Sequence, residues 1–122
     1  MKAWSFFAGC VFFVSLFSVN VSANPPPISE IVAAAQHGGA KEMLNAGLAY
    51  YQGWNGIKYD DDKAIYWFTK AAAKGSVDAE YYLGLVFCGQ KHNTGMAQYW
   101  FNKAAMDGSL DGLMLRDSDC ER

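Results

Sequence analysis

Apolar residues recur every three to four positions along most of the chain after residue 27, which is the spacing of an amphipathic helix. Ile65, Phe68 and Ala72 form one such series, and Trp67 and Ala71 widen its apolar face. No stretch alternates apolar and polar residues between turn signals, as a half-buried strand does. The pattern therefore predicts an all-α protein. Five helices and a short sixth one are expected over residues 28–37, 40–52, 61–74, 77–88, 94–107 and 109–116.

Capping residues stand at the predicted helix ends. Asp60 can accept a hydrogen bond from the first turn of the helix over 61–74, and Asn93 takes the same place before 94–107. Lys74 and Gly75 end the first of these helices, a cation where the helix dipole favours it and then a glycine. The run of three acids that begins at Asp60 lacks the alternate spacing, the glycine and the later glutamate of a calcium loop. It is interpreted as a capped, solvated first turn.

The chain repeats itself. Residues 63–79 match residues 96–112 at an offset of 33, with ten of 17 positions identical, and residues 43–51 match 80–88 at an offset of 37. Residues 31–38 resemble the end of the 63–75 segment. The array thus holds a half repeat, two fuller repeats and a third repeat that is cut short. Because one helix pair cannot bury its apolar face alone, neighbouring pairs must stack.

The repeated block resembles the Sel1-like repeat, a relative of the tetratricopeptide repeat. The family pattern is Leu-Gly-x-x-Tyr-x-x-Gly-x-Gly-Val-x-x-Asp-x-x-Lys-Ala-x-x-Trp-Tyr-x-Lys-Ala-Ala-x-x-Gly. The first repeat carries it at Ala46-Gly47, Tyr50, Gly53, Gly56-Ile57, Asp60, Lys63-Ala64, Trp67-Phe68, Lys70-Ala71-Ala72 and Gly75. The second repeat carries it at Leu83-Gly84, Phe87, Ala97, Trp100-Phe101, Lys103-Ala104-Ala105 and Gly108.

The sequence departs from the family pattern in its loops. The first loop, from Gly53 to Gly56, holds one residue more than the family's Gly-x-Gly, and the second repeat lacks the Gly-Val and Asp of its loop. The resemblance still covers residues 31–115 and implies a short α/α solenoid that binds other proteins. Gly47 and Gly84 are expected to let helices approach closely. Trp67 and Trp100, as repeated positions, are expected in the core.

The resemblance also implies a binding surface, because the first helix of each pair in such solenoids lines the concave face where partners bind. Tyr51 and Trp54 are the strongest expected anchors, since aromatic side chains give large contact area at low entropy cost. The expected partner-binding residues are Lys41, Leu44, Leu48, Tyr51, Gln52, Trp54, Asp78, Tyr81 and Leu85.

The first 23 residues have the features of a secretory signal peptide. Lys2 precedes an apolar run over residues 4–19, which ends before Val21-Ser22-Ala23. An uncleaved anchor is the alternative, but these 16 residues span only about 24 Å, against ~30 Å for the hydrocarbon core. Lipid attachment at Cys10 is less favoured because the apolar run continues past it. A leader with prolines over 24–30, the repeat array over 31–115 and a tail over 116–122 are expected to follow.

Export places the chain in an oxidising compartment, periplasmic or extracellular. Cleavage leaves two cysteines, Cys88 and Cys120. Stacking of equivalent helices brings their segments near each other, so a disulfide between them is expected. The alternative is a free thiol at Cys120, if the two Cα atoms lie more than ~7 Å apart.

Composition and motifs exclude several functions. Twelve acids against 10 bases give a net charge of -2, which argues against a nucleic-acid partner. No nucleophile elbow or phosphate loop is present, and His37 and His92 lack metal-ligand spacing. We therefore expect no catalytic residue, cofactor or metal, and no membrane span after signal cleavage.

The sequence thus predicts an exported interaction scaffold with a protein or peptide partner, and it leaves self-association open. One alternative is a protein that binds or hydrolyses peptidoglycan or β-lactams, as implied by cysteine-rich Sel1 relatives. Those relatives carry a cysteine pair in every repeat, and this chain does not. The other alternative is a cap or fragment that completes a longer partner.

Overall fold

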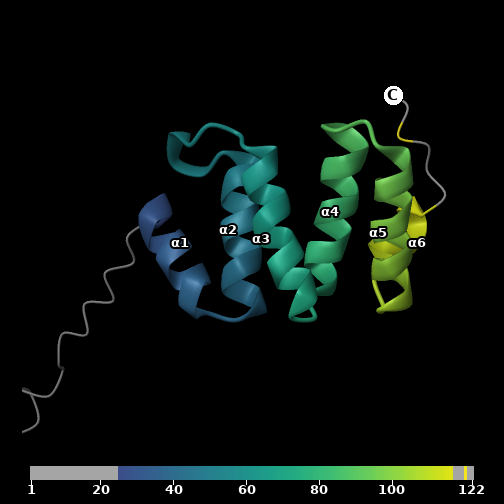
Figure 1. The fold of residues 1–122 in the computed structure, drawn as a ribbon, viewed down its shortest axis with the longest axis horizontal. Coiled ribbons are helices and arrows are strands. Elements are labelled where there is room, and N and C mark those ends of the chain that lie inside the picture. The colour runs from purple at the N-terminus through teal and green to yellow at the C-terminus, as the bar shows by residue number, and fades with distance from the viewer. Residues whose placement is uncertain (1–24, 117–119, 121–122) are drawn as a thin grey trace, which may run out of the picture.

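The computed structural model describes residues 25–116 and 120, and within them it contains helices and no strand (Figure 1). The predicted signal peptide and most of the predicted tail lie outside the described residues. None of the described helices is long and apolar enough to cross a membrane. The elements are α1 (Ile28–His37), α2 (Ala40–Gln52), the 3-10 turn η2 (Trp54–Gly56), α3 (Asp61–Ala73), α4 (Val77–Gly89), α5 (Thr94–Met106) and α6 (Leu110–Leu115).

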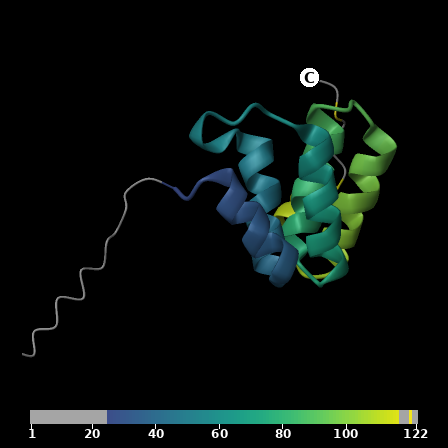
Figure 2. The same ribbon diagram turned by 60° about the vertical axis from the view of Figure 1, so that its left-hand side comes forward.

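Successive helices lie side by side in a row (Figures 1 and 2). The pairs α2–α3 and α4–α5 have the most extensive contacts, α3 packs on α4, and α2 also reaches α4. The first helices of the two full repeats therefore share one layer. The predicted all-α solenoid of stacked helix pairs is confirmed, and only the turn η2 was not predicted.

Side-chain caps fix where the helices begin. The Asp60 carboxylate accepts the N–H of the third residue of α3 at 2.9 Å, and the Asn93 side-chain oxygen does the same for α5 at 3.0 Å. Both caps were predicted. Ser76 and Ser109, which are equivalent in the repeat, cap α4 and α6 at 3.2 Å and 3.0 Å. All four caps satisfy amide groups that the first helical turn leaves without a partner.

A phenylalanine ring packs on a glycine in each helix pair. The ring of Phe68 on α3 lies against Gly47 on α2, so closely that a Cβ on Gly47 would overlap its Cδ1 and Cε1 atoms. Phe101 on α5 lies in the same way against Gly84 on α4. Phe68 is fully buried and Phe101 is 1% exposed. The predicted close approach of the helices thus occurs in both repeats through the same pair of residue types.

The two equivalent tryptophans differ in burial. Trp67 is 6% exposed and belongs to the core, as predicted. Trp100 is only partly buried, although its Nε1 is shielded from solvent and has no hydrogen-bond partner among the described residues. The core prediction therefore holds fully for Trp67 and in part for Trp100.

The C-terminal end of the stack leaves large apolar side chains exposed. Met106, Leu110 and Met114 are 87%, 77% and 79% exposed. Met114 is the equivalent of Tyr81 in the repeat. The ring of Tyr81 packs against that of Phe101, with the two ring centroids 6.2 Å apart. Among the described residues no helix follows α6 to make the equivalent contact.

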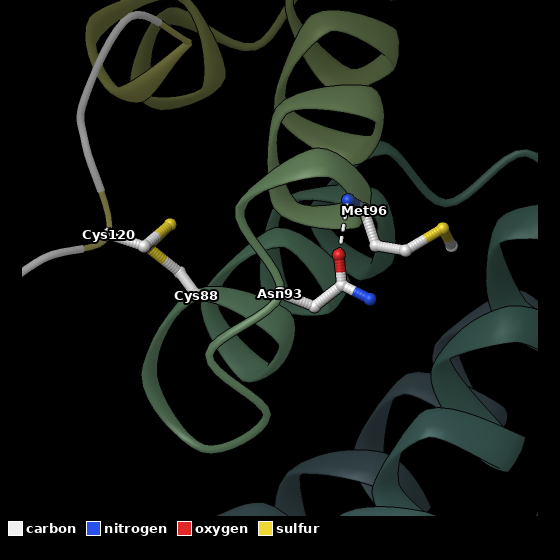
Figure 3. Close-up of a disulfide and its surroundings, with 4 residues drawn as sticks. All are labelled: Cys88, Asn93, Met96 and Cys120. Carbon is white, nitrogen blue, oxygen red and sulfur yellow. Dashed lines mark hydrogen bonds between the residues drawn. A yellow bond between two sulfur atoms is a disulfide. The ribbon is translucent and has the colours of Figure 1, made fainter.

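A disulfide ties the segment beyond α6 to the end of α4 (Figure 3). Cys88 and Cys120 are joined with their sulfur atoms 2.08 Å apart and their Cα atoms 5.0 Å apart. The bridge links positions 32 residues apart in sequence and thus spans the whole of α5 and α6.

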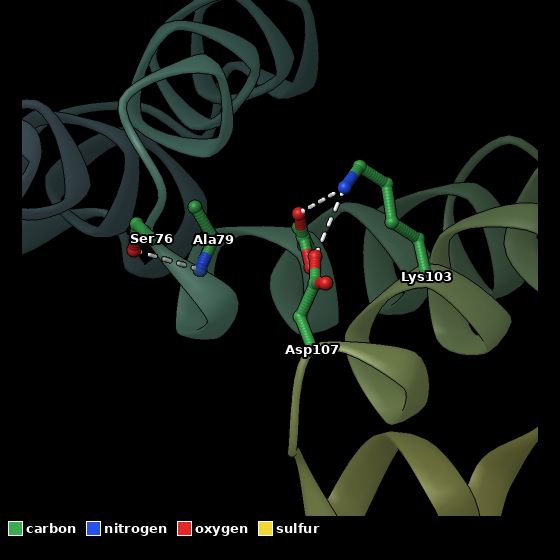
Figure 4. A network of polar contacts seen from close by, with 5 residues as sticks. Ser76, Ala79, Lys103 and Asp107 are labelled. Carbon is green, nitrogen blue, oxygen red and sulfur yellow. Dashed lines mark hydrogen bonds and ion pairs between the residues drawn. The ribbon is translucent and has the colours of Figure 1, made fainter.

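One carboxylate is buried among the stacked helices. Glu80 is 2% exposed, and its Oε1 lies 2.9 Å from Nζ of Lys103, which also contacts Oδ2 of Asp107 at 2.9 Å (Figure 4). The second oxygen of Glu80 has no hydrogen-bond partner among the described residues. Burial raises the pKa of Glu80 against the opposing effect of Lys103, and the hydrogen bond from Lys103 lowers the pKa of Asp107. The equivalent residues in the neighbouring repeats, Met43 and Leu113, are apolar.

The glycine–phenylalanine contact predicts a specific sensitivity to one methyl group. Gly84→Ala should destabilise the fold by about 1–3 kcal/mol, because the new Cβ overlaps the Phe101 ring and forces a shift in a packed core. Gly89→Ala is the matched control, since it lies on the same helix with no atom within 4 Å of its Cβ. It should be neutral or slightly stabilising. Urea unfolding measures both, and equal effects of the two substitutions would contradict the packing described.

Removing the disulfide should destabilise the protein. In the chain-entropy model, a loop of this length contributes about 3–4 kcal/mol, so Cys120→Ser should lower the free energy of unfolding by roughly that amount. Thiol titration of the unfolded, unreduced chain reports the bridge directly. Two reactive thiols from Cys88 and Cys120 in each chain would show that the bridge is absent in solution.

Glu80 should make stability depend on pH. Its pKa is higher in the folded state than the ordinary value of 4.5, so the native state holds this proton more tightly. Its contribution to stability therefore falls as the pH rises through the folded pKa. Glu80→Gln keeps the shape and removes this titration. The variant should gain stability relative to wild type over the pH range that starts at the ordinary value of 4.5 and rises through the raised pKa of Glu80. A stability difference that stays constant over this range, measured by urea unfolding, would refute the assignment.

Candidate functional site

The nine predicted partner-binding residues lie on α2, η2 and α4, and none of them is buried. We call the surface that they form the α2–α4 face. Three of its members are exposed, namely Lys41, Gln52 and Asp78. The other six are half-buried, namely Leu44, Leu48, Tyr51, Trp54, Tyr81 and Leu85.

Helical spacing places the members of this face in lines. On α2 the residues Leu44, Leu48 and Tyr51 follow each other at intervals of four and three, and each packs on the core with part of its surface. On α4 the residues Tyr81 and Leu85 are likewise four positions apart. The line on α2 therefore presents apolar side chains that pack on the core and remain partly exposed.

A cluster of aromatic rings joins α2 to α4. The ring of Tyr51 meets Phe68 edge-on at 6.2 Å and Tyr82 at 6.0 Å, and Tyr82 stacks on Phe68 with ring centroids 5.4 Å apart. Tyr81 lies next to Tyr82 at 5.5 Å. Tyr51 thus supports the fold as well as facing outward. Tyr82, which the sequence interpretation did not include, is the residue that connects the two lines.

The tyrosines of the face carry no charge at neutral pH. Burial raises the pKa of Tyr51 above its ordinary value of 10.0, with a further contribution from Tyr82. Burial also raises the pKa of Tyr81, and the charge of Asp111 adds to the effect. Both side chains therefore offer a ring and a neutral hydroxyl, which is the combination that favours protein recognition.

Trp54 lies in η2, and its indole Nε1 donates a hydrogen bond to Oε1 of Gln52 at 2.6 Å. It borders a cavity of about 270 Å³ between α1, α2 and η2, which we call the N-terminal cavity. The cavity is lined by Pro26, Glu30, Ile31, Ala34, Glu42, Asn45 and Trp54.

Six of these cavity residues were missed from the sequence. The signal that could have found them is the repeat register. Glu42 and Asn45 are polar at the positions that the next repeat fills with a buried alanine and with Tyr82. A polar residue at one copy of a repeated core position indicates that this copy is not covered.

Two acidic side chains at the start of α3 have structural contacts. Asp60 caps α3, and Asp62 pairs with Lys91 at 2.8 Å on the surface. Within residues 25–116 and 120, no three His, Cys, Asp or Glu side chains gather closely enough to hold a metal ion.

Stacked helix pairs with one half-exposed apolar face define the class of α/α-repeat proteins. The Sel1 repeat model matches residues 43–76 and 77–109, which together make up more than half of the chain. The protein therefore belongs to the Sel1 repeat family. Each matched unit runs from the first helix of a pair to the serine that caps the next first helix. Sel1 repeats generally mediate protein–protein interaction.

One curated relative is the ERAD-associated E3 ubiquitin-protein ligase component HRD3A of Arabidopsis thaliana, 42% identical over 53 residues. The match covers 43% of this chain and 8% of that protein, so the chain spans less than a tenth of its length. The similarity thus concerns a short segment of that protein. No solved structure matches the chain significantly.

Proposed function

We propose that the chain is an exported, non-catalytic scaffold that binds a protein or peptide partner on the α2–α4 face. The observation that carries the proposal is the solvent exposure of the nine residues of the α2–α4 face, none of which is buried. Leu44, Leu48 and Tyr51 rest on the core while remaining partly open to solvent. Apolar side chains that already pack on the core lose little conformational entropy when a partner covers them, which favours binding.

The relative supports an assembly role. HRD3A is by its name a component of a larger complex, and the part of it that resembles this chain is a stretch of 53 residues. The cell-wall alternative has less support, because the described cysteines, Cys88 and Cys120, form one bridge across α5 and α6 and not a pair within every repeat.

Variants of the face test the proposal. The immobilised chain is used to capture proteins from the compartment to which it is exported, and one captured partner is purified. Trp54→Ala and Lys41→Glu should each weaken its affinity by about tenfold or more, because they remove an anchor and reverse a charge. Circular dichroism should show unchanged helicity, since both side chains lie outside the buried core.

Tyr99→Ala is the matched control for these variants. Tyr99 is an aromatic residue on α5 that is 55% exposed, and it is not a member of the α2–α4 face. Its replacement should leave the affinity unchanged. Binding that depends on Tyr99 and not on Trp54 would place the partner on the second helices and contradict the proposal.

Export is the second part of the proposal. It rests on Lys2, the apolar run over residues 4–19 and the small residues that end at Ala23. The exported form should begin at Asn24. Mass spectrometry of the protein recovered outside the cytoplasm measures this, and a full-length mass or a lipid adduct on Cys10 would refute it.

A further inference from the structure

We propose that the N-terminal cavity binds the cationic side chain of an arginine or lysine of a protein partner. The inference deepens the proposed function and rests on it in taking the ligand to be part of a protein. At about 270 Å³ the cavity lies just below the range of about 300–1,000 Å³ for small-molecule sites. Its size therefore suits one long side chain rather than a whole metabolite.

The walls of the cavity suit an aliphatic stem. Ile31, which is 6% exposed, lines it together with Ala34 of the same helix and Pro26 of the leader. Trp54 supplies an aromatic wall, and the hydrogen bond from its indole to Gln52 holds the ring in place. Lysine and arginine bury their methylene groups along such surfaces while the charged head reaches a polar group. A cation over an indole face gains further stabilisation.

The polar groups of the cavity select a positive charge. Two of its seven lining residues, Glu30 and Glu42, are carboxylates, and none is a cation. Hydrogen bonds from the backbone N–H groups of Glu42 and Gly39 lower the pKa of Glu42, so this side chain is ionised at neutral pH. The Gly39 N–H lies 2.8 Å from its Oε2 and fixes its direction. Two negative charges beside apolar walls attract a cationic side chain and repel an acidic one.

The repeat register explains why the cavity is open. Asn45 on α2 is the equivalent of Tyr82 on α4 in the repeat. Tyr82 stacks on Phe68 and meets Tyr51, and both of these residues belong to the preceding helix pair. Among the described residues no first helix precedes α1, and none of them fills the equivalent slot next to α2. Polar residues at the end of an array also serve solubility. Solubility alone, however, does not require that another segment of the chain form a further wall of the cavity.

That further wall is built by the lengthened loop. Asn55, in left-handed backbone conformation with φ of 55°, donates from Nδ2 to the carbonyl oxygens of Pro25 and Pro26 at 2.9 Å and 3.1 Å. These bonds hold the leader against η2, so that Pro26 closes one side of the cavity. The loop that departs from the family pattern thus adds a wall to the cavity at the end of the α2–α4 face.

Nuclear magnetic resonance with a pair of matched probes tests the proposal. The probes are N-acetyl-arginine amide and N-acetyl-citrulline amide, which differ in the charge of the head group. The full chain is labelled with nitrogen-15, and the indole N–H resonance of Trp54 is followed. The arginine probe should shift this resonance with a dissociation constant on the order of 1–10 mM. The citrulline probe should bind about tenfold more weakly or less well still.

Substitution of both carboxylates completes the test. Glu30→Gln combined with Glu42→Gln should weaken arginine binding by about tenfold, while Gln at position 42 can still accept the bond from Gly39. Asp111→Asn, an exposed acid on α6, is the matched control and should leave binding unchanged. Equal binding of the two probes, unchanged binding by the double variant, or shifts centred on Asp62 would each overturn the inference.

The two proposals fail in different ways. If a partner is captured through the α2–α4 face and the arginine probe does not bind, the cavity inference alone is refuted. If the probe binds at Trp54 and no partner binds the face, the cavity chemistry stands and the scaffold proposal is refuted.

Discussion

The packing of a phenylalanine ring on a glycine is the contact on which the rest of the structure depends. Phe68 on Gly47 and Phe101 on Gly84 set how closely the two helices of each pair approach. With this separation fixed, Tyr82 can stack on Phe68 and meet Tyr51, which joins one pair to the next. The position of the α2–α4 face therefore follows from a contact that lies entirely beneath it.

The regular stack makes its exceptions informative. Glu80 is a buried carboxylate at a position that is apolar in the neighbouring repeats, and it is matched by Lys103 from the next helix. Burying the carboxylate of such a pair is costly, so the contact with the half-exposed Lys103 is weak evidence for added stability. Glu42 and Asn45 are exceptions of another kind, because their polarity marks the uncovered end where the N-terminal cavity lies.

The face is bordered by two features that the repeat itself does not supply. Trp54 and the lengthened loop lie at the end of α2, and the disulfide of Cys88 lies at the end of α4, where it occupies the position equivalent to Tyr51. A repeat supplies a uniform surface, whereas a particular partner requires local differences in shape and charge. These two borders are where this chain differs from a regular array.

The sequence by itself determined the helices and the stacking of pairs. Caps such as Asp60 and Asn93 act within one turn, and the repeated Gly84 and Phe101 act within one pair, so their effects are local and can be read along the chain. Tertiary structure alone decided that Tyr82 bridges α2 and α4. It also decided that Trp100 is less buried than Trp67, and that Asn55 pins the leader to form the cavity. These features depend on which surfaces a neighbouring element covers, and that coverage arises only when segments distant in sequence come together.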